Sequence, residues 1–148
     1  MLKDVLKLVP NKYFTINIEL KAGNRYYPLI EELVLEDIHR WAKCNIIISS
    51  FDHFALRNIK EIDNTIITGV LYNSSLIDVA DYAIEKVNSN ALHPYYMTLE
   101  NSLIVDAHKK SLMINPFTVD IPGDIKRLIQ YKVDNLITNY PDIALTYL

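Results

Sequence analysis

The chain has 148 residues, of which 50% are hydrophobic and 22% are charged, and its formal net charge is -3. This composition is typical of one globular domain and excludes global disorder. With 18 acidic against 15 basic residues, a nucleic-acid binder of the basic type is also excluded. The single cysteine, Cys44, excludes both a disulfide framework and a zinc site built from cysteines.

No apolar run approaches the roughly 18 residues that a membrane-spanning helix requires. Residues 1–10 lack the long apolar core of a secretory signal. We therefore expect no membrane span and a cytoplasmic location.

The spacing of apolar residues predicts a regular alternation of strands and helices. Helical spacing of Leu2, Val5 and Leu6 predicts a short helix first. β-Branched and aromatic runs then predict strands over 13–20, 45–51, 65–72, 91–96, 112–119 and 133–140. Helical patterns follow these strands, which gives about six βα units.

This alternation predicts an α/β fold with a parallel sheet. The continuous run Ile46–Ile48 is typical of a strand that is covered on both faces. Two architectures of the sheet are possible at this stage: an open, doubly wound sheet, or part of a barrel. No Gly-rich phosphate-binding loop follows any strand, so nothing supports nucleotide binding. The residues expected to cap helices are Asp52, Ser75 with Asp78, Thr98 and Asp120.

The segment 17–21, Asn-Ile-Glu-Leu-Lys, is the most informative for chemistry. Side chains alternate along a strand, so Asn17, Glu19 and Lys21 share one face. This places a carboxylate and an amine near the carboxyl end of the strand, where parallel α/β folds bind ligands. An edge strand with solvated charges, or a structural ion pair, explains the same pattern equally well.

The four histidines show no spacing that suggests a metal site. His39 and His108 fit the polar surface of helices, and His53 falls in a first helical turn. His93 lies in a short strand, where a structural role is at least as well supported as catalysis. Tyr95 and Tyr96 follow that strand and could line a ligand mouth or pack between helices. The helix start at 139–142 could hold an anion.

Six segments at the predicted strand ends occur in an order that resembles the second part of the glycerophosphodiester phosphodiesterase family. They are 17–21 (NIELK), 48–53 (ISSFDH), 68–72 (TGVLY), 93–94 (HP), 117–120 (FTVD) and 137–142 (ITNYPD). The resemblance covers nearly the whole chain. It implies a TIM-type (β/α) barrel.

The resemblance also implies a function in glycerol and lipid metabolism. Family members are hydrolases that release glycerol 3-phosphate and an alcohol from glycerophosphodiesters with a divalent cation, Mg or Ca. Three carboxylates hold the cation, and Glu19 matches the third. Lys21 matches the lysine that contacts substrate. Phe117 stands where the family has a tryptophan near the glycerol site.

The departures concern the segment that opens the family's domain. Its His-Arg-Gly motif, its Glu-x-Asp strand and its second catalytic histidine have no match here. Asp120 stands in place of an asparagine, and Lys132 and Asn135 in place of glycines. We therefore expect residues 1–148 to form a partial domain that lacks the first two barrel strands and both catalytic histidines.

Because the acid and the base lack candidates, we expect this phosphoric diester hydrolase domain to be inactive by itself. Three hypotheses follow from the residues. In the first, the chain is part of an active enzyme. In the second, it is a non-catalytic remnant that binds a partner or associates with itself through open barrel edges. In the third, it is a different α/β enzyme. A barrel that lacks two strands has exposed edges, which favours association.

Overall fold

The computed structural model describes residues 1–148 and contains one sheet of five parallel strands. The strands lie in chain order: β1 (Thr15–Leu20), β2 (Asn45–Ser50), β3 (Ile67–Tyr72), β4 (Ala91–Pro94) and β5 (Met113–Ile114). The α-helices are α1 (Leu2–Leu8), α2 (Ile30–Trp41), α3 (His53–Ile62), α4 (Val79–Tyr82), α5 (Asn101–Lys109), α6 (Pro122–Gln130) and α7 (Pro141–Leu145). A π-helical turn, η1 (Ala83–Val87), extends α4, and a 3-10 turn, η2 (Tyr96–Thr98), follows β4.

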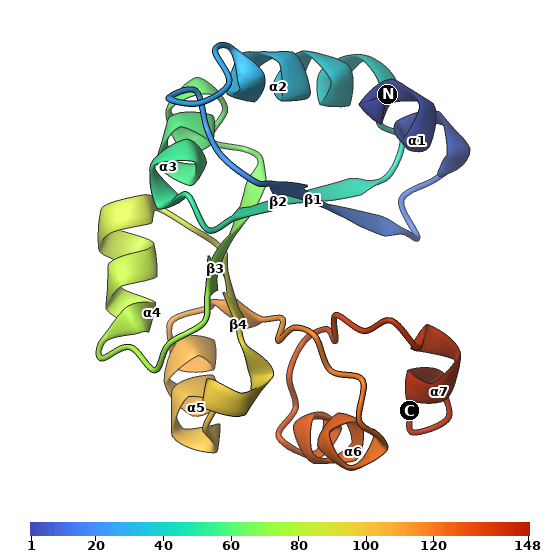
Figure 1. The fold of residues 1–148 in the computed structure, drawn as a ribbon, viewed down its shortest axis with the longest axis vertical. Coiled ribbons are helices and arrows are strands. Elements are labelled where there is room, and N and C mark those ends of the chain that lie inside the picture. Colours follow the sequence, from blue (N-terminus) through green and yellow to red (C-terminus); the bar gives the residue numbers. More distant parts are fainter.

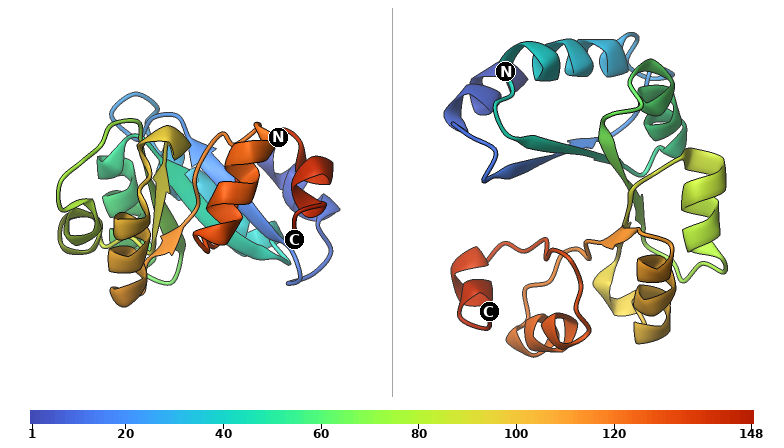
Figure 2. Two further views of the ribbon diagram at one scale, coloured as in Figure 1. Left: turned by 90° about the horizontal axis from the view of Figure 1, so that it is seen from below. Right: turned by 180° about the vertical axis from the view of Figure 1, so that it is seen from behind.

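The helices cover one face of the sheet, and the sheet curves so that its other face turns toward the centre of an open ring (Figure 1). A doubly wound sheet carries helices on both faces, so helices on one face alone favour part of a barrel. The expected α/β fold with an incomplete TIM-type barrel is confirmed. The two chain termini lie on the same side of the ring (Figure 2).

The register of the strands sorts the side chains between the two faces. Ile18 of β1 pairs with Ile48 of β2, and these outward residues belong to the core beneath the helices. One residue along, Glu19 pairs with Ser49, and Ser49 with Gly69. Near the carboxyl ends of β1 and β2 the inner face therefore carries polar side chains, whereas Ile47 and Ile67 make it apolar deeper in the sheet.

The last two predicted strands are less regular than the sequence suggests. Only Met113–Ile114 of the segment 112–119 forms a regular strand, although Asn115 N and Phe117 N still donate to carbonyls of β4. Pro116 has no N–H to donate on its other side, toward residues 133–140. Residues 133–140 form no strand, although this segment follows the edge of the sheet through backbone bonds. Asp134 N donates to the Ile114 carbonyl at 3.0 Å, and Ile137 N to the Pro116 carbonyl at 3.0 Å. The sixth unit is thus an extended segment along the edge of the five-stranded sheet.

One of the four expected helix caps is confirmed. The Asp52 carboxylate accepts a hydrogen bond from the Phe54 N–H at 3.2 Å, at the start of α3. Thr98 does not cap α5, because its hydroxyl donates to a nearby carbonyl. Asp78 precedes α4 with φ 52° but makes no capping bond, and the carboxylate of Asp120 is bonded to residues 138 and 139 instead.

None of the helices has the length and apolar character needed to cross a membrane.

We predict that Gly69→Ala destabilises the sheet. Gly69 faces inward against His93, and an added Cβ would lie 2.7 Å from its Cδ2 and 2.8 Å from its Cε1. Overpacking of this kind typically costs about 1–3 kcal/mol, which urea unfolding measures directly. Gly123→Ala is the matched control, because its Cβ meets no atom within 4 Å. Equal unfolding free energies for both variants would contradict the close contact.

Candidate active site

The carboxyl end of β1 brings Glu19 and Lys21 together, as the alternation of side chains predicts. Lys21 Nζ donates to Glu19 Oε1 at 2.8 Å. The Lys21 side chain is 80% exposed and that of Glu19 is 31% exposed. An ion pair so open to water contributes about 0–1 kcal/mol. The ammonium group is therefore free to leave the carboxylate for a stronger anion.

Aromatic side chains from distant strands meet at the same end of the sheet. Phe51 follows β2 and Phe117 follows β5, yet their ring centroids lie 5.7 Å apart in an edge-to-face arrangement. In a flat sheet, three strand spacings would separate them by about 14 Å. The curvature of the sheet thus closes the distance, and Tyr95 adds a third ring 6.2 Å from Phe117.

The backbone fixes Phe117 in this position. Its N–H donates to the Pro94 carbonyl at 3.0 Å, and its carbonyl accepts from Tyr96 N at 2.9 Å. Tyr96 is buried, while Tyr95 is half-buried and faces Phe117. The packing interpretation is therefore confirmed for Tyr96, whereas a place for Tyr95 at a ligand mouth stays a prediction.

The loop after Lys21 is anchored by two carboxylates. Asp52 Oδ2 accepts from Gly23 N at 3.2 Å, and Glu31 Oε1 accepts from Asn24 N at 3.0 Å. Glu31 is completely buried, and Asn58 also donates to its Oε1. These bonds fix residues 23 and 24 just beyond Lys21, so the loop leaves β1 in one conformation.

A second polar network lies on the inner face, deeper in the sheet. Asn115 Nδ2 donates to His93 Nε2 at 2.9 Å, and Asn135 Nδ2 donates to Asn115 Oδ1 at 2.9 Å. Asn17 donates to the Ser49 hydroxyl at 3.0 Å. A cavity of about 340 Å³ separates these groups, with Asn17 on one side and Asn115 on the other.

The structure gives the histidines structural roles. His93 is fully buried, and burial lowers its pKa from 6.5 to about 4, so the ring is neutral. His53 binds the Leu71 carbonyl through Nε2 and the Tyr82 hydroxyl through Nδ1, both at 2.9 Å. His39 pairs with Asp63, and His108 with Asp134. None of the hydrogen bonds of these four rings involves Glu19 or Lys21.

Residues 1–148 do not fit a divalent cation as its complete binding site. They contain no group of three His, Cys, Asp or Glu side chains that could hold a metal. Calcium takes six to eight oxygen ligands and magnesium requires octahedral coordination. One oxygen of Glu19 is already bonded to Lys21. Glu19 can serve as one ligand among several, but it cannot hold the ion alone.

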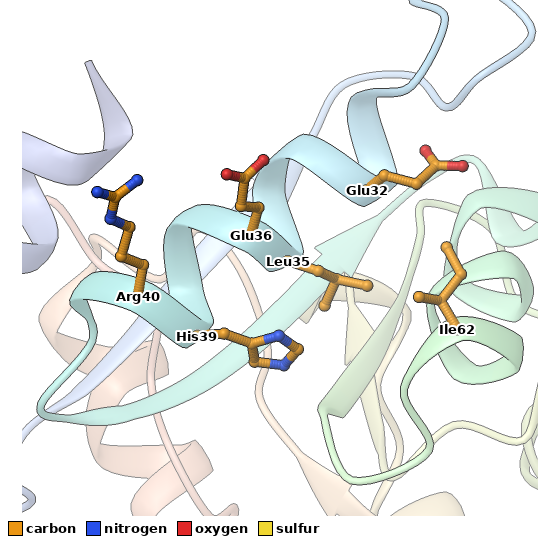
Figure 3. A pocket seen from close by; sticks show the side chains of 6 residues that line it. All are labelled: Glu32, Leu35, Glu36, His39, Arg40 and Ile62. Carbon is orange, nitrogen blue, oxygen red and sulfur yellow. The ribbon is translucent and has the colours of Figure 1, made fainter.

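A charged hollow on α2 lies away from this end of the sheet. It has a volume of about 480 Å³ and is lined by Glu32, Leu35, Glu36, His39, Arg40 and Ile62. These residues lie along α2 and at the end of α3, on the outside of the helical layer (Figure 3). Its charged side chains are all exposed to solvent, so none of them is removed from water within the hollow.

Comparison with known proteins shows which family this chain matches. The family model described as "Glycerophosphoryl diester phosphodiesterase family" matches residues 1–143. This chain belongs to that family. The glycerophosphodiester phosphodiesterase of Caldanaerobacter subterraneus subsp. tengcongensis is 34% identical over 142 residues, which are 95% of this chain and 58% of the relative. That of Bacillus altitudinis is 32% identical and covers 97% of this chain and 60% of the relative.

Solved structures of the family have the same fold. The glycerophosphodiester phosphodiesterase of Thermotoga maritima matches with a TM-score of 0.69 and 26% identity, covering 99% of this chain and 62% of that one. An Oleispira antarctica phosphodiesterase, solved in complex with the product sn-glycerol-3-phosphate, matches with a TM-score of 0.81 and 18% identity, over 90% of this chain and 55% of that one. The chain therefore spans about three-fifths of the length of the curated relatives it matches.

The structure places the three residues suggested by the resemblance, Glu19, Lys21 and Phe117, at carboxyl ends of strands or just beyond them. Their roles remain predictions. Sequence reasoning missed Phe51, which contacts Phe117, and Glu31, which fixes the loop after Lys21. Phe51 directly follows the residue that pairs with Leu20, so parallel register is the signal that could have found it.

We predict that the stability of the chain falls between pH 6.5 and about pH 4. The unfolded chain binds a proton at His93 near pH 6.5, whereas burial delays this protonation to about pH 4 in the folded state. The unfolded state then holds more protons, so the unfolding free energy decreases as the pH falls, by an amount on the order of 3 kcal/mol. Urea unfolding at several pH values measures the slope. His93→Gln removes the titrating group and should flatten it, and an unchanged slope in that variant would assign the effect elsewhere.

Proposed function

We propose that this chain supplies part of the active site of a glycerophosphodiester phosphodiesterase, which releases glycerol 3-phosphate and an alcohol. The observation that carries the proposal is the Glu19–Lys21 pair at the carboxyl end of β1, in a chain that belongs to this family. The location of the pair supports the proposal, because parallel α/β barrels assemble their sites at this end.

Each residue has a role that its chemistry supports. Lys21 neutralises part of the charge of the phosphodiester, and its loose pairing with Glu19 allows it to turn toward the anion. Phe117, with Phe51 and Tyr95 against it, offers an apolar wall to the carbon chain of glycerol. Glu19 contributes one oxygen to a divalent cation, Mg or Ca. The other oxygen ligands come from outside this chain.

Hydrolysis also needs proton transfer that these residues do not supply. Water adds to phosphorus while the bond to the leaving oxygen breaks, so a base must accept a proton from water and an acid must protonate the alkoxide. His93 is buried and His53 is bonded through both ring nitrogens. We therefore propose no catalytic residue in residues 1–148, and we expect the chain by itself to be inactive. Its cytoplasmic location also remains a prediction.

A non-catalytic binding or self-associating module is the second candidate. One observation favours it: β1 pairs only with β2, so one edge of this six-residue strand is free. A folded chain that binds a partner tightly and contributes to no hydrolysis when the partner is present would favour this candidate.

We expect no release of glycerol 3-phosphate when the purified chain is incubated with a glycerophosphodiester. Too few metal ligands surround Glu19 for a divalent cation, and these residues supply no general acid or general base. The assay is run with magnesium, with calcium and with a chelator, and circular dichroism confirms that the chain is folded. Metal-dependent release that disappears in Glu19→Ala would show that these residues assemble a working site.

Lys21 is tested in a chimera that adds to this chain the residues of the Caldanaerobacter relative that lie outside the match, in their natural order. We expect metal-dependent hydrolysis by the chimera. Lys21→Ala should lower kcat/KM by about 10- to 10²-fold, since a charge-assisted bond to phosphate contributes about 1.5–3 kcal/mol. Lys21→Arg keeps the charge and should recover part of the loss, while Lys12→Ala, at an exposed lysine before the opposite end of β1, should not change it. An active chimera that is insensitive to Lys21→Ala would remove the lysine from the site.

A further inference from the structure

We propose that the cavity between the loop after β3 and the start of α5 binds a small neutral polyol, a molecule that carries hydroxyl groups on adjacent carbon atoms. The cavity has a volume of about 230 Å³, and its lining residues belong to two short segments of the chain, 72–76 and 98–103. The proposal stands independently of the proposed hydrolysis, because the cavity and the Glu19–Lys21 pair lie on opposite faces of the sheet.

The alternation of side chains along β3 places the cavity on the outer side of the sheet. Gly69 faces inward against His93, so Val70 and Tyr72 face outward. Both of these residues belong to the core beneath the helices. α4 and α5 lie next to each other in the helical layer that covers β3 and β4 (Figure 1). The cavity therefore opens at the helical layer, and not toward the centre of the ring.

The inner wall of the cavity carries a buried hydroxyl group that has no partner. Tyr72 is 6% exposed and is the only buried residue of the lining. Its hydroxyl makes no hydrogen bond. Burial raises the pKa of Tyr72 above its ordinary value, so the hydroxyl keeps its proton and can donate. Buried polar groups without a partner are rare because they cost free energy, and a hydroxyl group of a ligand would supply this partner.

The start of α5 adds backbone donors at the side of the cavity. α5 has nine residues, and no side chain caps its first turn. The N–H groups of Asn101 and Ser102 make no backbone hydrogen bond, which is the usual state of the first positions of a helix. Ser102 is exposed and lines the cavity. These donors are therefore available to an oxygen atom of a ligand.

The charges around the cavity favour a neutral ligand. Glu100 precedes α5 and contributes an exposed carboxylate, which accepts hydrogen bonds but repels an anion. No lysine, arginine or histidine lines the cavity. The start of a helix carries a partial positive charge, which disfavours a cation. Hydroxyl groups both donate and accept, so a polyol satisfies Glu100 and the helix donors at the same time.

The remaining lining and the size of the cavity fit a short polyol. Leu76 and Leu103 offer apolar contacts to the carbon atoms of the ligand. Thr98 donates its hydroxyl to the Tyr95 carbonyl at 2.8 Å, so it can only accept from a ligand. The volume of about 230 Å³ corresponds to on the order of seven water molecules, each with about 30 Å³ in the liquid. This space fits a molecule such as glycerol and excludes an oligosaccharide.

The experiment titrates the isotope-labelled chain with glycerol and follows the amide chemical shifts residue by residue. We expect saturable shifts at Asn101, Ser102 and Leu103, with half-saturation at about 1–10 mM, because so small a ligand binds weakly. The matched control ligand is 1-propanol, which has the same carbon skeleton with a single hydroxyl group and should give only small, linear shifts. Inorganic phosphate is the probe for an anion at the start of α5, and it should give no saturable shift.

Two pairs of variants assign the contacts. Tyr72→Phe removes only the hydroxyl without a partner, so it should not lower the unfolding free energy, but it should weaken glycerol binding at least fivefold. Tyr96→Phe, at a buried tyrosine that does not line the cavity, should leave binding unchanged. Glu100→Ala should also weaken binding at least fivefold, whereas Glu85→Ala, at an exposed carboxylate on η1, should not. Circular dichroism and urea unfolding show that each variant is folded.

A titration without saturable shifts at the start of α5 overturns the proposal, as does saturation that is equally strong with 1-propanol, with phosphate or in Tyr72→Phe. Lys21→Ala separates this cavity from the candidate active site. The shifts at Asn101 and Ser102 should persist in that variant. Their loss in Lys21→Ala would show that glycerol binds at the candidate active site instead, and would contradict the proposal.

Discussion

The parallel register of β1, β2 and β3 is the constraint on which the rest of the molecule depends. Because side chains alternate strictly, pairing Glu19 with Ser49 also pairs Ile18 with Ile48, and one register sorts both faces at once. A slip by one residue would place Glu19 under the helices and the isoleucines in the open ring. The apolar packing of the outer face therefore holds the candidate site on the inner face.

The curvature of the sheet follows from what each face carries. The outer face packs isoleucine, valine and leucine against helices, whereas Gly69 on the inner face leaves room for the buried His93 ring. Strands can therefore approach on the inside, and the contact between Phe51 and Phe117 shows how far the curvature extends. The aromatic wall beside the candidate site is a consequence of packing deeper in the sheet.

Electrostatics at the end of β1 bear directly on the proposed role of Lys21. Lys21 satisfies one oxygen of Glu19 in water-exposed surroundings, where the pair contributes little stability. Such a pair exchanges partners readily when a phosphate or a cation approaches. Asp120 differs, because bonds from Thr138 and Asn139 lower the pKa of its carboxyl group and use both of its oxygens.

Local sequence patterns predicted the elements better than the contacts between them. The helical spacing of Leu33, Val34 and Ile38 favours one buried stripe along α2, yet Leu33 is 55% exposed while Val34 and Ile38 are buried. Glu31 takes an inward position instead, because its partners Asn24 and Asn58 come from a loop and from α3. The pairing of Glu19 with Lys21 was predictable because both residues lie on one strand.

The loss of regularity at β5 has a physical cause that a pattern of apolar residues does not contain. Pro116 has no N–H to donate toward residues 133–140, and this segment follows the sheet edge through only a few backbone bonds. At the other edge, β1 is six residues long and fully regular. The two edges of this sheet thus differ: one is already blunted by an irregular segment, whereas the other presents a complete row of backbone groups. The unpaired edge of the sheet is therefore the one beside Glu19 and Lys21, the residues of the candidate site.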